Sequence, residues 1–299
     1  MIKYNAVDQA IFVSMELNRI CVCGAGTMGS GIAQAAATAG FYTVLYELNA
    51  EVLQKANDSI QKNLQTLVQK NKISSVQADE IFQRILFTDN LHDCLADVII
   101  EAIIEKLDAK ISLFNQLAEI NHGETIFATN TSSLPVTAIA KNVLHPHRVA
   151  GMHFFNPATI MKLVEVVKTE FTAGEVIETL VVLATQMGKT AVVCKDAPGF
   201  IVNRVARPYY ITALRIAEAG NCSFDQIDRI MEASGFKMGP FKLMDLIGND
   251  VNYAVSCSVY DQLAKPERLK PSYLQKEKVD KGELGRKTGK GYYDYGAKS

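Results

Sequence analysis

The sequence lacks an excess of charge of either sign. Of its 299 residues, 31 are Lys or Arg and 32 are Asp or Glu, so the formal net charge at pH 7 is −1. Proteins that bind nucleic acid or an anionic membrane surface through their charge carry a basic excess. The composition therefore gives no reason to expect nucleic acid or a membrane as partner and favours a small molecule.

The sequence also lacks a C-x-x-C pair and any Cys/His cluster. Spacings of that kind are typical of zinc sites, and many regularly spaced cysteines in a short chain are typical of small disulfide-rich proteins. We therefore expect no metal site, no disulfide framework and a reducing compartment. The six cysteines are Cys21, Cys23, Cys94, Cys194, Cys222 and Cys257.

Long hydrophobic runs are missing as well. No apolar stretch approaches the ~20 residues of a membrane span. The first 18 residues contain Asp8 and Glu16 and have neither an Arg-rich presequence nor the apolar core of a signal peptide. We expect residues 1–18 to be a leader outside the domains and the protein to be cytoplasmic.

Glycines follow the first predicted strand in the pattern G-x-G-x-x-G. The apolar run 19–23, RICVC, has the composition of a buried strand, and Gly24, Gly26 and Gly29 come directly after it. The Ala-rich stretch that continues to Gly40 has the composition of a helix. Such a triplet can also mark ordinary turns. Between a strand and a helix it predicts a dinucleotide site, because these glycines allow a tight turn, close approach of pyrophosphate and helix–strand packing.

A carboxylate follows at the spacing expected for contact with the adenosine ribose. The second predicted strand, YTVLYE, ends at Glu47, twenty-three residues after Gly24. Glu47 would bind the ribose hydroxyls and repel a 2′-phosphate, so NAD is favoured over NADP unless a nearby basic side chain reverses the preference. The alternative is a solvated glutamate at a strand end. Thr27 and Met28, inside the glycine loop, are also expected to contact the cofactor.

Strand-like and helical stretches alternate through the following part of the chain. The apolar runs ILFT (85–88), DVIIEA (97–102), TIFAT (125–129) and RVAGMHF (148–154) are separated by stretches such as 107–120. This alternation predicts an α/β fold with a doubly wound, Rossmann-type parallel sheet. Ligands of such sheets bind beyond the carboxyl ends of the strands, where polar residues gather here. Those residues are Glu101 with Glu105, the NTSS segment 130–133, and His153.

The chain changes character at Pro198-Gly199. Beyond it the stretches 201–219, 224–234 and 241–264 have helical patterns. We expect a Rossmann domain over 19–197 and a smaller, all-helical domain over 198–299.

One histidine and one glutamate interrupt the apolar stretch GMHFFNPATIMKLVEVV. His153 and Glu165 lie symmetrically about Thr159, and Asn156-Pro157 is a turn signal. If the flanking strands pair as a loose hairpin, the two side chains come opposite each other. A carboxylate can then fix the imidazole tautomer while the other ring nitrogen exchanges a proton with substrate. The alternative is a chance core histidine beside a strand-face carboxylate.

Seven segments together resemble one family along the chain from about Arg19 to Tyr295. The segments are GAGTMGSGIAQ, EAIIEK, TNTSSLP, GMHFFNPATIMKLVEVV, KDAPGFIVNR, MGPFKLMDLIG and GRKTGKGYYDY. With these segments in this order, the chain resembles the L-3-hydroxyacyl-CoA dehydrogenases, including bacterial 3-hydroxybutyryl-CoA dehydrogenases, which act in fatty acid metabolism and β-oxidation.

The resemblance implies that NAD accepts a hydride from C3 of a 3-hydroxyacyl-CoA while a histidine takes the hydroxyl proton. By similarity His153 is this base and Glu165 orients it. Ser132 matches a serine that hydrogen-bonds the reacting oxygen, and Asn203 matches an asparagine that helps to hold the substrate.

Further positions are implied as NAD contacts. They are Glu105, Lys110, Asn156 and Lys287. The alternative for Lys110 is that it forms only a solvated ion pair and does not contact NAD. In the family the helical C-terminal domain forms a homodimer interface. The segment from Asn49 to about Lys72, with Ser59, Lys62 and Lys70, corresponds to a region that touches CoA in the family. The sequence does not identify which of its basic residues makes the contact.

Several functions stay open beside the expected 3-hydroxybutyryl-CoA dehydrogenase. One is a 3-hydroxyadipyl-CoA dehydrogenase. Another is a sugar-acid dehydrogenase of the same fold, and the segment NTSSL and the seven family segments are the features that argue against it. A third, of a different class, is a dinucleotide-binding module without turnover. Such a module would be expected to lose His153, Glu165 or Ser132, and all three are present.

Overall fold

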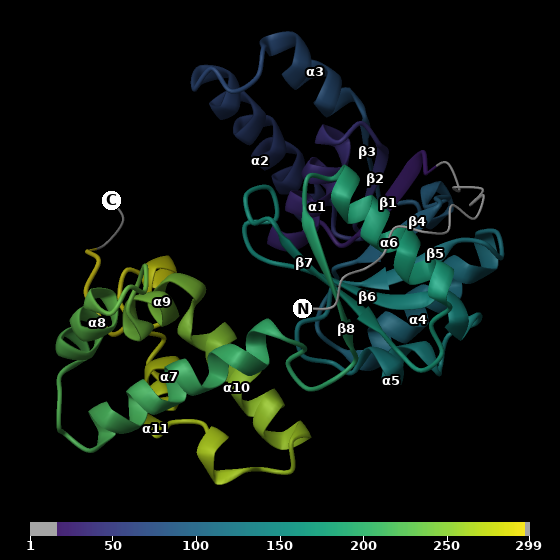
Figure 1. Ribbon diagram of the computed structural model, residues 1–299. Coiled ribbons are helices and arrows are strands. Elements are labelled where there is room, and N and C mark those ends of the chain that lie inside the picture. Colours follow the sequence, from purple (N-terminus) through teal and green to yellow (C-terminus); the bar gives the residue numbers. More distant parts are fainter. Residues whose placement is uncertain (1–16, 297–299) are drawn as a thin grey trace, which may run out of the picture. The chain divides into compact units, whose positions relative to one another are not determined.

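The computed structural model describes residues 17–296 of the chain. The predicted leader therefore lies outside the described residues, except for its last two. The described chain forms two compact units (Figure 1). The first comprises the residues up to 130 together with 140–166 and 170–193, and the second comprises 131–139, 167–169 and the residues from 194 onwards.

An eight-stranded sheet is the centre of the first unit. Its strand order is β3-β2-β1-β4-β5-β6-β7-β8, and the pairs from β3 through to β6 are parallel. The first six strands thus have the order of a dinucleotide-binding sheet, which confirms the predicted fold class. The strands are β1 (Arg19–Cys23), β2 (Tyr42–Tyr46), β3 (Ile85–Thr88), β4 (Val98–Glu101), β5 (Ile126–Thr129), β6 (Val149–Phe154), β7 (Leu163–Lys168) and β8 (Thr190–Lys195).

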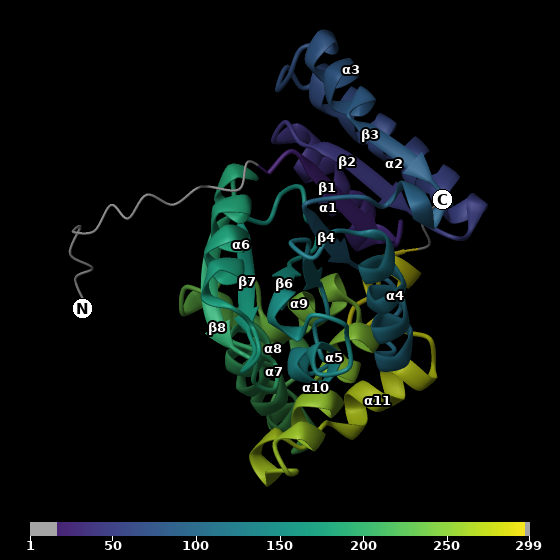
Figure 2. The same ribbon diagram turned by 90° about the vertical axis from the view of Figure 1, so that its right-hand side faces the viewer.

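Helices cover both faces of this sheet, because its central strands are apolar on both sides. All four residues of β4 and of β5 are buried. Figure 2 shows α4 and α6 on opposite sides of the sheet, and in Figure 1 the pair α2 and α3 projects beyond it. The helices of the first unit are α1 (Thr27–Thr38), α2 (Ala50–Gln69), α3 (Ser75–Gln83), α4 (Leu107–Ile120) and α6 (Gly174–Gln186), with the 3-10 turns η1 (Leu91–Asp93) and η2 (Pro146–Arg148). The short helix α5 (Val136–Ala140) has its residues 136–139 in the second unit.

The second unit is built mainly from helices. Phe241, Met244 and Leu214 are fully buried in its largest apolar cluster. None of the helices within residues 17–296 combines the length and the apolar character needed to cross a bilayer. The helices are α7 (Val202–Glu218), α8 (Phe224–Ala233), α9 (Pro240–Ile247), α10 (Asn249–Gln262) and α11 (Tyr273–Asp280), with the 3-10 turns η3 (Glu267–Leu269) and η4 (Arg286–Thr288).

A buried aspartate organises the end of the second unit. The carboxylate of Asp245 accepts hydrogen bonds from the backbone N–H groups of Tyr292 and Tyr293, both at 3.0 Å, and from the Tyr295 hydroxyl at 3.0 Å. A Cβ at Gly291 would lie 2.1 Å from Asp245 Oδ1, so this position requires glycine. The segment GKGYYDY is therefore explained by packing around one carboxylate.

One expectation from the sequence is wrong, and one arrangement of side chains has no counterpart in the sequence pattern. The stretch 241–264 is not one helix, because Gly248 has a φ of +106°, which ends α9 before α10 begins. Three of the six cysteines come together in the fold. Cys21, Cys23 and Cys94 are buried together, with their sulfur atoms within 4.8 Å of one another.

Candidate active site

The turn between β1 and α1 has the close packing that the three glycines predict. Gly24 has a φ of +99° and donates its N–H to the Tyr46 carbonyl at 2.8 Å. A Cβ on Gly29 would lie 1.7 Å from the Gly24 oxygen, so the helix can approach the strand only with glycine there. A Cβ on Gly26 would meet nothing within 4 Å. The turn is thus tight on its inner side and open at Gly26.

The N-terminus of α1 suits an anion. Its N-cap is Gly26, which provides no side-chain cap for the N–H groups of the first turn. The Ser30 hydroxyl instead donates back to the Gly26 carbonyl at 2.8 Å. Thr27 is exposed at this end, whereas Met28 is half-buried against the core. Uncapped N–H groups and the helix dipole together favour a phosphate.

Glu47 is held against the same turn. Its Oε2 accepts the Ala25 N–H at 3.0 Å and its Oε1 accepts the Asn49 N–H at 3.0 Å. Each carboxylate oxygen can accept a further hydrogen bond. The carboxylate therefore has a fixed orientation and retains the capacity to accept from ribose hydroxyls.

A buried ion pair lies at the carboxyl end of β4. The Lys110 ammonium is 2.5 Å from Glu101 Oε1 and 3.2 Å from Glu105 Oε2, and the side chains of Lys110 and Glu101 are 1% and 0% exposed. Glu101 also accepts from the Thr129 hydroxyl at 2.7 Å. Burial raises the pKa of Glu101, and the neighbouring Lys110 opposes this shift. Lys110 is therefore no solvated surface lysine, and Glu101 fixes its position toward Glu105.

His153 and Glu165 come together on neighbouring strands. His153 Nδ1 and Glu165 Oε2 are 2.7 Å apart, with the residues 5% and 1% exposed. An ionised Glu165 carboxylate can only accept, and it would then favour the tautomer that carries the hydrogen on Nδ1 and leaves Nε2 as the acceptor atom of the ring. Asn130, at the end of β5, accepts the Phe154 N–H at 2.8 Å and so aligns the ends of β5 and β6. This arrangement can take up and release a proton.

Ser132 lies in the second unit, in a turn held by its neighbours. The Thr131 hydroxyl oxygen accepts the N–H groups of Ser133 and Leu134 at 3.3 and 2.9 Å, which folds the chain around Ser132. The Ser133 carbonyl accepts from Gln262 Nε2, on α10, at 2.7 Å. Contacts between α10 and the adjacent Ser133 carbonyl therefore help to set the position of Ser132.

Asn203 and Lys287 belong to the second unit as well. Asn203 is in the first turn of α7, and its carbonyl accepts from the buried Arg207 side chain at 3.0 Å. The Lys287 ammonium binds both carboxylate oxygens of Asp250, at 2.6 and 2.7 Å. Lys287 is thus paired within its own unit.

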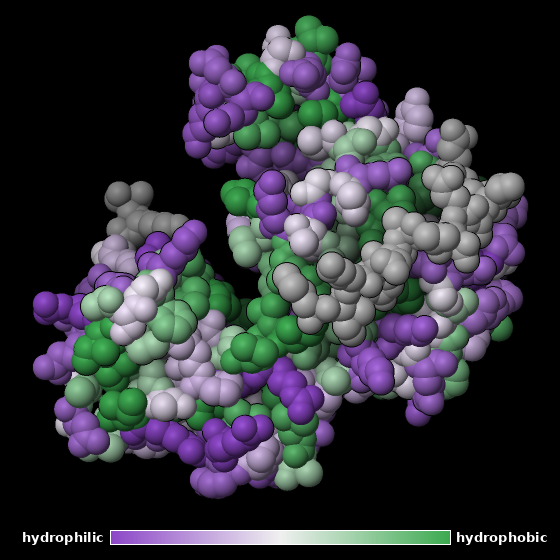
Figure 3. All heavy atoms as spheres, viewed as in Figure 1, coloured by the Kyte–Doolittle hydropathy of each residue, from purple (hydrophilic) through white to green (hydrophobic). Residues whose placement is uncertain are grey.

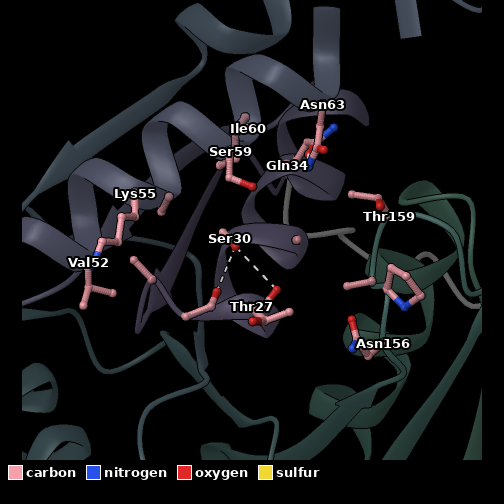
Figure 4. A pocket seen from close by; sticks show the side chains of 16 residues that line it. Thr27, Ser30, Gln34, Val52, Lys55, Ser59, Ile60, Asn63, Asn156 and Thr159 are labelled. Carbon is pink, nitrogen blue, oxygen red and sulfur yellow. Dashed lines mark hydrogen bonds between the residues drawn. The ribbon is translucent and has the colours of Figure 1, made fainter. Parts of the chain in front are cut away.

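A pocket of about 370 Å³ opens beside the glycine turn, between α1, α2 and the loop from β6 to β7. Figure 4 shows Lys55, Ser59 and Asn63 along one side of α2. The sequence reasoning named Ser59 in this segment, together with Lys62 and Lys70, which do not line the pocket, and it missed Lys55 and Asn63. The spacing of four residues between Lys55, Ser59 and Asn63 could have found them, because such residues share one helix face. Of the predicted cofactor contacts, the pocket brings together Gly26, Thr27 and Asn156, and its other linings are Ala25, Ser30, Gly31, Gln34, Val52, Ala56, Ile60, Pro157, Ala158 and Thr159.

Comparison with known proteins identifies the two parts of the chain. Residues 19–197 match the model of the 3-hydroxyacyl-CoA dehydrogenase NAD binding domain, and residues 199–295 match that of the C-terminal domain. The chain belongs to the 3-hydroxyacyl-CoA dehydrogenase family. This confirms the predicted family, the NAD cofactor and the enzyme class, an NAD-dependent dehydrogenase.

Individual members of the 3-hydroxyacyl-CoA dehydrogenase family align over most of the chain. A 3-hydroxyadipyl-CoA dehydrogenase of Escherichia coli is 45% identical over 95% of this chain, which spans 60% of that relative's length. A probable 3-hydroxybutyryl-CoA dehydrogenase of Bacillus subtilis is 40% identical over 95% of this chain and 100% of its own. The solved structure of (S)-3-hydroxybutyryl-CoA dehydrogenase from Ralstonia eutropha is 34% identical, with a TM-score of 0.89 over 94% of this chain and 99% of its own.

Proposed function

We propose that this protein interconverts 3-hydroxyacyl-CoA and 3-ketoacyl-CoA with NAD, and that 3-hydroxybutyryl-CoA is its substrate. The single observation that carries the proposal is the 2.7 Å contact between His153 and Glu165 in the NAD-binding part of the chain. A buried carboxylate beside one ring nitrogen prepares the other nitrogen for acid–base chemistry at a substrate hydroxyl.

In the proposed mechanism His153 takes the proton of the 3-hydroxyl group and Glu165 stabilises the resulting imidazolium. Ser132 and Asn203 hold the substrate oxygen, where hydrogen-bond donors stabilise developing negative charge. Bound NAD supplies the acceptor for the hydride from C3. In the reverse direction His153 returns the proton to the carbonyl oxygen.

The residues around the glycine turn fit NAD. Gly26 leaves open space beside the uncapped start of α1 for pyrophosphate, and Glu47 is oriented to accept from a ribose. The proposed remaining contacts are Gly24, Thr27, Met28, Gly29, Glu105, Lys110, Asn156 and Lys287.

The pocket beside α2 suits the CoA part of the substrate. Lys55 is its cationic side chain, and Ser59 and Asn63 offer hydrogen bonds on the same helix face. A phosphate would pair with the lysine, and the amide groups of a pantetheine arm would bond to the hydroxyl and amide side chains.

We also propose that residues 19–197 and 198–299 act as the NAD-binding and the substrate and dimerisation domains. Support for a homodimer is apolar exposure on the second unit, where Ile230 on α8 is 59% exposed and Val205 on α7 is 72% exposed. Figure 3 shows hydrophobic residues among hydrophilic ones over α8. Light scattering of the purified protein would measure the assembly. The free cysteines support a cytoplasmic location.

The test is oxidation of NADH by acetoacetyl-CoA, followed by absorbance, with NADPH in parallel. We expect turnover with NADH and little with NADPH. The name of the Escherichia coli relative makes 3-ketoadipyl-CoA the second substrate to compare, and a higher kcat/KM with it would replace the four-carbon assignment. Absence of turnover with either acyl-CoA and either cofactor would contradict the proposal.

A matched pair of variants tests the CoA pocket. Lys55→Ala should raise the KM for acetoacetyl-CoA about tenfold, the value of one charge-assisted hydrogen bond, with kcat retained. Lys62→Ala, on the same helix but outside the pocket lining, should leave KM unchanged. Equal effects in both variants would show that the pocket does not hold the CoA phosphates.

A further inference from the structure

Two buried thiols lie on one face of the first strand. Residues that alternate along a strand share a face, so Arg19, Cys21 and Cys23 point to one side of β1 and Ile20 and Val22 to the other. Cys21 and Cys23 are both 0% exposed, and their sulfur atoms are 3.8 Å apart. The strand thus presents a pair of thiols to the layer that covers this face.

A third thiol completes the group from a distant part of the chain. Cys94 follows η1, is 0% exposed, and lies with its sulfur within 4.8 Å of both others. The separation of Cys23 from Cys94 in the sequence hides this cluster from any spacing rule. The fold brings the two segments together because β4, which follows Cys94, pairs with β1.

The spacing of the sulfur atoms suits a metal ion. Zinc–thiolate bonds of ~2.3 Å at tetrahedral angles place two sulfur atoms about 3.8 Å apart. The sulfur atoms of Cys21 and Cys23 are separated by this distance. The Cys94 sulfur lies within 4.8 Å of both, so a small shift of its side chain would complete the site. Soft thiolate donors select soft cations over magnesium or calcium.

The charge beside the cluster suits a divalent ion. Three thiolates around a divalent cation leave one net negative charge, which is costly to bury alone. Arg19, on the same strand face, donates from its guanidinium to the carbonyl of Asp93 at 3.0 Å, directly before Cys94. Its positive charge favours thiolates here, whereas the negative charge of the neighbouring Asp93 carboxylate opposes them, so the bound cation supplies most of the balancing charge.

We propose that Cys21, Cys23 and Cys94 form a three-thiolate site for one divalent thiophilic cation, of which zinc is the representative. The site would join β1 to the loop before β4 directly beneath the cofactor turn, because Cys23 precedes Gly24. Three protein ligands are one fewer than a closed structural zinc site has, so a strong chelator should remove the ion. Binding should therefore stabilise the first unit reversibly.

The experiment uses the reduced, chelator-treated full chain and titrates Zn²⁺ against a chromophoric competitor, with Cd²⁺ added separately to detect thiolate charge-transfer absorbance. We expect about one equivalent of ion per chain, with thiol protons released on binding. Cys94→Ser should abolish the Cd²⁺ absorbance and the tight equivalent. The matched control Cys257→Ser, a half-buried thiol of the second unit, should keep both.

Absence of a tight equivalent in the parent protein, or equal binding by Cys94→Ser, would overturn the site and leave the buried thiols as apolar packing. X-ray absorption at the zinc edge of the loaded parent protein decides the question if Cys94→Ser does not fold. About three sulfur neighbours near ~2.3 Å support the site, and a shell of nitrogen and oxygen overturns it.

Discussion

The two units each bury a carboxylate almost completely, yet they use it differently. Glu165 in the first unit is 1% exposed and contacts the titratable ring of His153. Asp245 in the second unit is 0% exposed and accepts from the backbone N–H groups of Tyr292 and Tyr293. Burial alone therefore does not distinguish a site from a structural contact.

The partners of the buried charge make the difference. Backbone N–H groups cannot change protonation, and burial raises the pKa of the Tyr295 hydroxyl to about 12, so neither kind of partner exchanges protons near neutral pH. Asp245 therefore holds the end of the chain in place. An imidazole can change protonation near neutral pH, so Glu165 acts on a group that can do chemistry. We expect substitutions in the first unit to change turnover and substitutions around Asp245 to change stability.

The largest expected effect is on His153. In His153→Gln the amide can still hydrogen-bond Glu165, so the fold is retained, but no group is left to take the proton. Turnover of acetoacetyl-CoA should fall by about 10²- to 10⁴-fold, the range for loss of a general acid–base group. Binding of NADH, measured by fluorescence, should be nearly unchanged. His122→Ala, at an exposed histidine, is the control, and equal turnover in the two variants would sink the assignment.

Asp245→Asn should affect stability instead. The asparagine amide would place donors opposite the backbone N–H of Tyr293 and the Tyr295 hydroxyl, at a cost of about 1–3 kcal/mol for a buried unsatisfied group. Denaturant unfolding should detect this loss, while kcat per folded molecule stays constant. Asp294→Asn, at an exposed aspartate near the same segment, should change little. A loss of kcat in a fully folded Asp245→Asn would contradict the structural role.

Smaller effects on stability and NADH binding are expected for substitutions at two glycines of the cofactor turn. Gly29→Ala must displace the helix from the Gly24 carbonyl, so it should cost about 1–3 kcal/mol of stability and weaken NADH binding as well. Gly26→Ala has room for its Cβ, so it should weaken NADH binding with stability retained. Calorimetric unfolding and NADH titration of both variants separate the two roles. Equal stability losses would show that the two positions are equally packed.

The sequence predicts the elements that have strong local signals. Residues 85–88 and 107–120 were expected as a strand and a helix, and β3 and α4 have these bounds. The hairpin interpretation placed His153 opposite Glu165, and the structure brings them to 2.7 Å. The symmetric placement of the two residues about one turn signal was sufficient there, because both residues lie close in the chain.

The rest depended on contacts that no local pattern encodes. The helix expected over 241–264 breaks at Gly248, whose φ is +106°. The ion pair of Lys110 with Glu101 and the meeting of Cys94 with Cys23 join separate elements through the order of the sheet. Strand β8 was not expected from the sequence, and in the structure its residues are mostly exposed.

The most direct test of the acid–base assignment is a double-mutant cycle in kcat for acetoacetyl-CoA reduction. The four proteins are the parent, His153→Gln, Glu165→Gln and the double variant. If Glu165 acts through His153, Glu165→Gln alone should slow turnover at least about tenfold, and the double variant should be no slower than His153→Gln. Independent, multiplying losses, or a Glu165→Gln variant that turns over at the parent rate, would contradict the account.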